Sequence, residues 1–171
     1  MNRMSERSDQ PADDNSDMLG KTEEIITRNE NRVFRAALAI MGNKSDAEDI
    51  IQDVFVKLIE KQPRFESPEH ETAWLIRVTV NQCKSHFRSY WQRKTVPLLD
   101  SYPAQSDEQH DLIYAIAALA PKYRTAIHLF YYEGYSTKEI AEITKQKEST
   151  VREQLTRARR LLKVILEGDQ P

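Results

Sequence analysis

Apolar residues recur at alternating intervals of four and three in two stretches of this chain. Residues at that spacing share one face of an α-helix, because the helix completes a turn about every 3.6 residues. The pattern therefore predicts two amphipathic helices, each with one face in a hydrophobic core. The repeating positions are Ile76, Val80, Cys83, Phe87 and Tyr90 in the first stretch and Val151, Leu155, Ala158, Leu162 and Ile165 in the second.

Capping signals place further helices in the first half of the chain. A helical pattern starts at Thr22 and ends at Gly42-Asn43, and Ser45-Asp-Ala-Glu48 has the sequence of a capping box that begins a second helix. A third helix should begin with Ser67 as N-cap and Pro68 at its first position. Seven prolines and four glycines in 171 residues are too few for a turn-rich β-sandwich, so we expect an all-α fold.

The second half of the chain also has the patterns of several helices. A helical pattern covers residues 112–119, and after a break at Ala120-Pro121 comes a helix expected to bury Ala126, Ile127, Phe130 and Tyr131. Ser136-Thr-Lys-Glu139 is a second capping box, which begins a short helix. A turn around Lys145-Gln146-Lys147 then leads to the last helix, which is rich in arginine.

Composition divides the chain into two domains. Residues 1–20 are polar and acidic, and we expect them to be disordered; residues 95–108 show no sustained period and are typical of a flexible linker. The two small helical domains would then span residues 21–94 and 109–171. The net charge is −2, but the acids are segregated: residues 95–111 hold four acids and no base, so basic faces can survive elsewhere.

The segment 74–94 carries one such basic face. It holds five Lys or Arg residues, four aromatic residues and no Asp or Glu. One residue beyond the apolar positions, about 100° around the helix, a second stripe consists of Arg77, Asn81, Lys84, Arg88 and Trp91. Cations neutralise phosphates and aromatic rings stack on unpaired bases, so this stripe suits opened DNA strands. We interpret Phe87, Tyr90 and Trp74 as packing residues.

The capped short helix, the turn and the basic helix at 148–163 form the pattern of a helix-turn-helix, which places its second helix in a DNA groove. A solvated basic helix at the end of a domain would have the same composition. The two basic segments together favour a chain that contacts DNA at two places.

Other functions find little support. The four histidines lack ligand spacing, there is no glycine-rich phosphate loop, and the acids Asp46, Glu48, Asp49 and Asp53 fit the start of a helix. We therefore expect no enzyme activity, metal or cofactor. The single cysteine, Cys83, excludes an internal disulfide and fits a buried core position. No signal peptide or membrane span is evident, so we expect a soluble, cytoplasmic protein.

Several motifs, taken in order, resemble an extracytoplasmic-function (ECF) sigma factor of the sigma-70 family. The helix Asp46–Leu58 looks like the family's "dAEDl-Q-vF-kl" segment, and Trp74–Asn81 followed by Arg88 looks like its "WL-rIA-N" promoter-melting helix. Leu119–Arg124 resembles "LP--yR", with Ala120 in place of the first Pro. The helix-turn-helix matches "y--eEIAe", "TVk" and "RAR" in Tyr135–Glu142, Thr150–Arg152 and Arg157–Arg159. The resemblance covers roughly residues 22–166.

The resemblance implies a specificity subunit of RNA polymerase, not an enzyme. Its first domain would dock on core polymerase and bind the −10 element, and its second would bind the −35 element. Polymerase docking falls on Asp46, Glu48, Asp49, Gln52, Asp53 and Phe55. In the −10 region, Arg77, Lys84 and Arg88 would follow the DNA backbone, Asn81 would bond a flipped base and Trp91 would stack.

For the −35 element, Arg152 and Arg157 are candidates for groove and phosphate contacts, and Gln154 and Thr156 for base edges. Ser149, Thr150 and Glu153 complete the expected set. The family's usual further partner is an anti-sigma factor, often membrane-bound. This chain departs from the family at Ser85, a frequent Asp, at Gln154, often Arg, and at the Lys145-Gln146-Lys147 turn, where a small and an apolar residue are usual.

Two alternatives remain open. A stand-alone helix-turn-helix regulator that binds duplex DNA as a dimer would leave residues 46–58 and 74–94 without a role. A helical interaction protein with no DNA role would not explain four aromatic residues beside five uncompensated cations.

Overall fold

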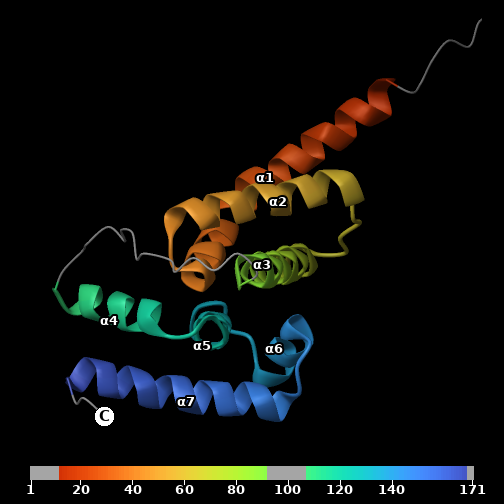
Figure 1. The fold of residues 1–171 in the computed structure, drawn as a ribbon. Coiled ribbons are helices and arrows are strands. Elements are labelled where there is room, and N and C mark those ends of the chain that lie inside the picture. The colour runs from red at the N-terminus through yellow and green to blue at the C-terminus, as the bar shows by residue number, and fades with distance from the viewer. Residues whose placement is uncertain (1–11, 92–106, 169–171) are drawn as a thin grey trace, which may run out of the picture.

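The computed structural model describes residues 12–91 and 107–168, and all the regular structure in these ranges is helical (Figure 1). This confirms the expected all-α class. Three helices come from the first domain and four, with a π-helical turn, from the second. They are α1 (Ala12–Met41), α2 (Lys44–Lys61), α3 (Pro68–Trp91), α4 (Asp107–Ala118), α5 (Pro121–Ile127), the π-helical turn η1 (His128–Tyr132), α6 (Thr137–Thr144) and α7 (Glu148–Glu167).

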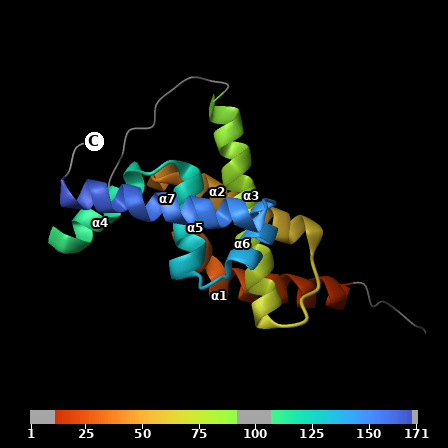
Figure 2. The same ribbon diagram turned by 90° about the horizontal axis from the view of Figure 1, so that it is seen from below.

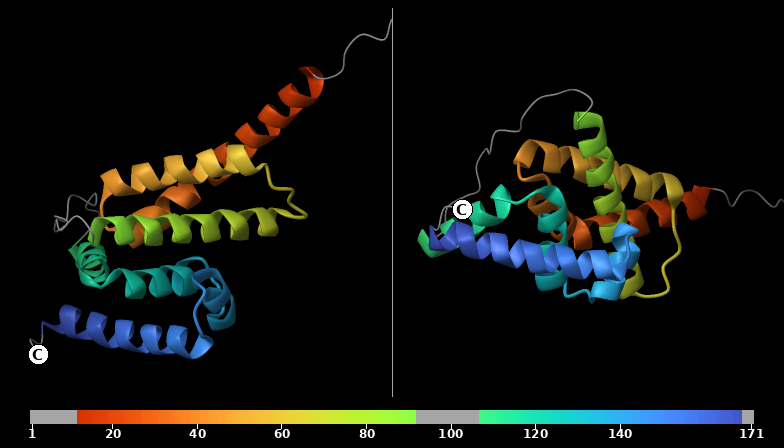
Figure 3. Two further views of the ribbon diagram at one scale, coloured as in Figure 1. Left: turned by 45° about the vertical axis from the view of Figure 1, so that its right-hand side comes forward. Right: turned by 60° about the horizontal axis from the view of Figure 1, so that its bottom comes forward.

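The two domains pack on each other. In the first, α1, α2 and α3 form one layer, and in the second α7 crosses α5 and contacts α4 and α6 (Figures 1 and 2). Between the layers, α1 packs against α5 and α3 against α6 (Figure 3). Buried side chains from both domains, such as Ile40, Ile76 and Ile140, belong to one continuous hydrophobic core. Within the described ranges, no helix combines the length and apolar character needed to cross a membrane.

The first helix begins earlier than the sequence pattern predicts. We expected residues 1–20 to be disordered and the helix to start at Thr22, but α1 begins at Ala12. Residues 1–11 and most of the expected linker, 95–106, lie outside the described residues, and Asp107 and Glu108 already belong to α4. The added turns carry an ion pair between Lys21 and Asp17, at 2.6 Å. Extending a formed helix adds one hydrogen bond per residue fixed, which explains how a polar segment can continue it.

Two of the three expected capping arrangements are confirmed. The hydroxyl of Ser67 accepts from the amide of His70 at 3.1 Å, and Ser136 and Glu139 form a reciprocal capping box. The expected box at Ser45–Glu48 is wrong, because Asn43 caps α2 instead, accepting from the amide of Asp46 at 2.8 Å. Gly42, with a φ of +80°, turns the chain early enough for Asn43 to reach that position.

The π-helical turn changes which side chains face the core. We expected Tyr131 on the apolar face, but it is 59% exposed, and Leu129 is fully buried instead. A π turn closes its hydrogen bonds over five residues, so a 3.6-residue period loses phase across it. The end of α7 also differs from the prediction, because Ile165 is 43% exposed while Val151, Leu155 and Ala158 are buried.

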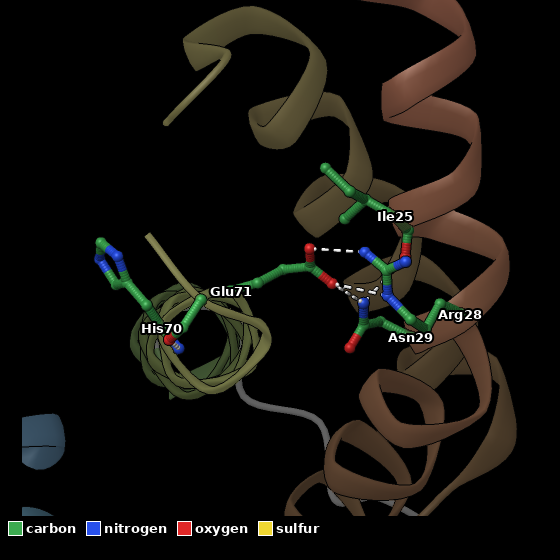
Figure 4. A network of polar contacts seen from close by, with 6 residues as sticks. Ile25, Arg28, Asn29, His70 and Glu71 are labelled. Carbon is green, nitrogen blue, oxygen red and sulfur yellow. Dashed lines mark hydrogen bonds and ion pairs between the residues drawn. The ribbon is translucent and has the colours of Figure 1, made fainter. Parts of the chain in front are cut away.

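A buried carboxylate ties α3 to α1 (Figure 4). Glu71 accepts from the guanidinium of Arg28 at 2.7 and 3.2 Å and from the side-chain amide of Asn29 at 2.6 Å. Asn29 is 4% exposed and its amide also donates to the carbonyl of Ile25. The start of α3 is therefore fixed against α1 by polar contacts rather than by apolar packing alone.

We predict that Glu71→Ala lowers the free energy of unfolding by about 1–3 kcal/mol, because Asn29 would lose a buried acceptor. Glu69→Ala, at an exposed position two residues earlier in the same turn, should change it by less than about 0.5 kcal/mol. Chemical denaturation followed by far-UV circular dichroism measures both values. Equal losses in the two variants would contradict the role of the network.

Candidate nucleic-acid interface

The structure places the cationic stripe of α3 as the sequence predicts, beside a buried apolar face. Ile76, Val80 and Cys83 are fully buried, and burial raises the pKa of the Cys83 thiol to about 12, so it is a core residue. In the neighbouring stripe, Arg77 and Arg88 are exposed, while Asn81 and Lys84 are half-buried. Trp91 is the last residue of α3, and its side chain lies outside the described part. Trp74 packs edge-on against Phe65, at 5.8 Å between ring centroids.

The stripe does not face open solvent along its whole length. The ammonium of Lys84 donates to the backbone carbonyl of Thr144, at the C-terminal end of α6 in the second domain. Its pKa is lowered, first because the group is partly buried and then because Lys145 and Arg88 lie near it. The middle of the predicted −10 surface therefore contacts the predicted −35 domain.

The second domain contains the expected helix-turn-helix. The chain leaves α6 through Lys145, which adopts a left-handed conformation with a φ of 54°, and enters α7 at Lys147. A left-handed lysine is uncommon because its Cβ crowds the backbone. The amide of Gln146 donates to the carbonyl of Ala141 at 2.9 Å, which ties the turn back to α6.

The exposed face of α7 carries most of the predicted −35 residues. Ser149, Arg152, Glu153, Thr156 and Arg157 are exposed and Thr150 is half-buried. Ion pairs hold both arginines, Arg152 with Glu148 at 2.7 Å and Arg157 with Glu153 at 2.6 Å. Glu148 also accepts from the hydroxyl of Thr137 at 2.6 Å, so it links the two helices of the motif. Sequence reasoning did not identify Glu148.

Gln154 lies apart from this group. Its half-buried side chain lines a cavity of about 120 Å³ between the domains, together with Lys84, Thr144 and Gln146. In this arrangement its side chain is only partly accessible to solvent.

The predicted polymerase-docking face lies on α2. Glu48, Asp49, Gln52 and Asp53 are exposed, Asp46 is half-buried beside its capping partner Asn43, and Phe55 is packed against the core. The helix also exposes two apolar side chains: Val56, at 50%, which sequence reasoning missed, and Ile59, at 47%, which the helical pattern wrongly predicts to be buried. The sequence signal that could have identified them is an apolar pair three residues apart on an amphipathic helix.

The contacts between the domains were not predicted from the sequence. The buried guanidinium of Arg124, in α5, donates to the carbonyl of Ile40 at 3.0 and 2.7 Å, at the end of α1. Arg32, in α1, pairs at 2.7 Å with Glu133, whose side chain is 1% exposed and also contacts His128 at 3.3 Å. Burial alone would raise the pKa of Glu133, but hydrogen bonds from His128 and Arg32 outweigh it and lower the pKa.

A helical chain with a cationic helix face in one domain and a helix-turn-helix in the other has the architecture expected of a protein that contacts DNA at two places. Comparisons with known proteins agree. Residues 25–93 match the family model for sigma-70 region 2, and residues 109–162 match that for sigma-70 region 4. The two matches together cover most of the chain in the order that the motifs indicate.

Individual relatives belong to the same family. The ECF sigma factor SigE of Mycolicibacterium smegmatis is 29% identical over 157 residues, covering 84% of this chain and 61% of SigE. SigV of Bacillus subtilis is 28% identical over 149 residues, covering 82% of this chain and 88% of SigV. Among solved structures, the sigma factor RpoE of Bartonella quintana in complex with the anti-sigma factor NepR is similar with a TM-score of 0.74. It is 25% identical, and the match covers 88% of this chain and 99% of RpoE.

The chain belongs to the sigma-70 family, as an RNA polymerase sigma factor of the ECF class. The match to region 2 gives residues 46–58 and 74–91 a place that a stand-alone helix-turn-helix regulator would not give them.

We predict that Glu133→Gln lowers the stability of the protein at neutral pH by about 2 kcal/mol, because the carboxylate loses charge-assisted hydrogen bonds. The folded-state pKa of Glu133 is lowered, so its contribution is present above its ordinary value of 4.5 and is lost as the pH falls through the folded value. The difference from the parent should therefore shrink below about pH 4.5. Denaturant titrations across this range test it, with the exposed Glu142→Gln as control. A difference that stays constant on acidification would refute the prediction.

Proposed function

We propose that this protein directs core RNA polymerase to specific promoters, with α3 holding the opened −10 strands and α6–α7 reading the −35 duplex. The observation that carries the proposal is the acid-free C-terminal part of α3, with exposed Arg77 and Arg88, in one chain with a capped helix-turn-helix. Both features fall inside the matches to regions 2 and 4.

In α3 the cations and the amide have different tasks. Arg77 and Arg88 follow the phosphate backbone, where they add affinity without sequence preference. Asn81, between them on the same stripe, offers a donor and an acceptor to a base that has left the stack. Unstacking a base costs on the order of a few kcal/mol, so a pocket must compensate it. Trp91 adds a stacking partner at the end of the helix.

In α7, the arginines reach DNA by exchanging partners. Arg152 and Arg157 each lie in an exposed ion pair one turn along the helix, with Glu148 and Glu153. Such surface pairs contribute little to stability because water and salt screen them, so phosphates can replace the carboxylates. Thr156 and Gln154 are the candidates for contacts with base edges, although Gln154 is half-buried beside the cavity between the domains.

Polymerase docking is assigned to α2. Its exposed carboxylates provide charge. The neighbouring Val56 and Ile59 provide exposed apolar area that a partner can bury. An anti-sigma factor, often membrane-bound in this family, is the second expected partner. The solved structures of RpoE and CnrH, which this chain resembles in fold, contain the anti-sigma factor NepR and the cytosolic domain of CnrY. We place the protein in the cytoplasm, where the polymerase acts.

Reconstituted transcription tests the proposal. Core polymerase supplied with this protein should initiate at specific sites in a genomic promoter library, and core enzyme alone should not. Asn81→Ala should reduce initiation on duplex templates much more than on templates with a premelted −10 region, because its role lies in holding an unstacked base. Core enzyme that gains no promoter-selective start would refute the function.

A second prediction concerns α7. Arg157→Ala should weaken binding to the −35 duplex by a similar factor across sequences and flatten its salt dependence, because phosphate contacts carry no sequence information. The control is Lys163→Ala, which removes another exposed cation of the same helix, paired with Glu167 at 3.8 Å. Fluorescence anisotropy at several salt concentrations measures both. An altered base preference with full affinity in Arg157→Ala would contradict the assignment.

A further inference from the structure

The two ion pairs on the exposed side of α7 have the same spacing but different surroundings. Arg152 pairs with Glu148 at 2.7 Å and Arg157 with Glu153 at 2.6 Å, in both cases across one helical turn. Among the described residues, Glu153 bonds only to its arginine, whereas Glu148 also accepts from the hydroxyl of Thr137, in α6, at 2.6 Å. The Glu148 side chain is accordingly less exposed, at 38% against 59% for Glu153. One carboxylate is fixed from two helices and the other from one.

Glu148 reaches α6 because of its place at the start of α7. It is the first residue of the helix and precedes the buried Val151 and Leu155 by three and seven residues, so it lies on the side of the helix turned to the core. α6 packs beside this end of α7 (Figure 1), and Thr137 is its first residue. Arg152 follows Glu148 by one turn and is exposed. The carboxylate of Glu148 therefore joins α6 to the guanidinium of Arg152.

This contact fixes the direction of the Arg152 side chain. The pKa of Glu148 is lowered, first by the hydrogen bond from Thr137 and then by that from Arg152, so the carboxylate is charged at neutral pH. Arg152 donates to it through one terminal nitrogen, and its other N–H groups have no acceptor in the described part of the chain. A guanidinium is a planar fork of donors, so a bond at one nitrogen orients the rest. Less rotamer freedom is then lost when those donors bind DNA.

The fixed carboxylate also limits what Arg152 can bind. A phosphate that replaced Glu148 would stand beside an anion that Thr137 keeps in place, and the two would repel each other. Glu153 has no second contact and can turn away, so the exchange of a carboxylate for a phosphate is easier at Arg157. A guanine edge is different, because its O6 and N7 are uncharged acceptors that match two N–H groups of one guanidinium. Recognition helices present their N-terminal residues to base edges, and Arg152 lies closer to that end than Arg157.

We propose that Glu148 is a positioning residue for −35 recognition: with Thr137 it directs Arg152 at a guanine of the duplex, and it disfavours contacts of Arg152 with phosphates. The inference rests on the proposed reading of the −35 duplex by α6 and α7. Arg157, whose carboxylate has no second contact, supplies affinity without base preference. The two ion pairs are alike in spacing, but one serves specificity and the other affinity.

Selection from a duplex library with a randomised −35 element, carried out with the polymerase holoenzyme, measures the base preference at each position. Arg152→Lys keeps the charge but loses the fork, so it should lower the preference for guanine at one position. Glu148→Ala should lower it at the same position by about tenfold, the discrimination that a bidentate contact gives. Thr137→Val, which removes a hydroxyl outside α7, should act there in the same direction. The control is Glu142→Gln, at an exposed carboxylate of α6, which should match the parent.

Salt dependence separates positioning from a structural role. Without Glu148, Arg152 is free to bind phosphates, so the affinity for unrelated duplexes should rise and the slope of its logarithm against log salt should steepen by about 1. Glu153→Gln frees Arg157 instead and should raise the affinity for all sequences by a similar factor. A structural loss in Glu148→Ala would weaken binding to every sequence and lower the melting temperature. Fluorescence anisotropy at several salt concentrations and thermal unfolding measure these effects.

A double variant tests whether Glu148 acts through Arg152. Adding Glu148→Ala to Arg152→Lys should cause no further loss of guanine preference. A Glu148→Ala variant that keeps the preference, or that weakens binding to all sequences alike, overturns the inference, and so does an Arg152→Lys variant with unchanged preferences. In these cases the parent holoenzyme still selects promoters, and the function proposed for the chain stands. A parent holoenzyme that selects no −35 sequence refutes the proposed function and this inference with it.

Discussion

The guanidinium of Arg124 is the contact on which the arrangement of the domains depends. From α5 it donates to the carbonyl of Ile40 at the end of α1 and, at 3.0 and 2.7 Å, to those of Ala117 and Leu119 at the end of α4. The last carbonyls of a helix have no partner within it and carry the negative end of its dipole, so one buried cation satisfies two helix ends. Gly42 lies against this group and turns the chain between α1 and α2 with a φ of +80°, a conformation that favours glycine.

The charges of the chain follow from this geometry. The buried guanidinium of Arg124 is compensated by carbonyl oxygens, and the buried carboxylate of Glu133 by Arg32 and His128. Because these buried charges have partners of their own, the acids on α2 and the cations on α3 and α7 stay on the surface. That separation explains how a chain with a net charge of −2 keeps two faces suited to DNA. It also explains why the domain contact weakens at the stripe, where Lys84 meets other cations instead of an acid.

The sequence predicts what depends on helical period and on local capping. The buried positions of α3, the caps at Ser67 and Ser136 and the exposed arginines of α7 follow from spacing and residue type alone. Tyr131 was misplaced because the π turn breaks the period, and the start of α1 because a formed helix propagates into polar residues. The partners of Arg124 and Lys84 could not be predicted from the sequence, since both side chains bond to backbone carbonyls, which any residue supplies.

The turn of the helix-turn-helix departs from the family pattern, and this departure has a physical consequence. Lysine and glutamine stand at Lys145-Gln146, where a small and an apolar residue are usual, yet the Gln146 amide still closes the turn between α6 and α7, with Lys145 in a left-handed conformation. The consequence lies on the other side of the turn, where Lys145 approaches Lys84 and the Gln146 oxygen stays unsatisfied in the cavity between the domains. An apolar side chain and no added cation would seal that cavity. The two polar residues therefore keep the turn closed on α6 but leave an unsatisfied oxygen and a neighbouring cation at the cavity between the domains.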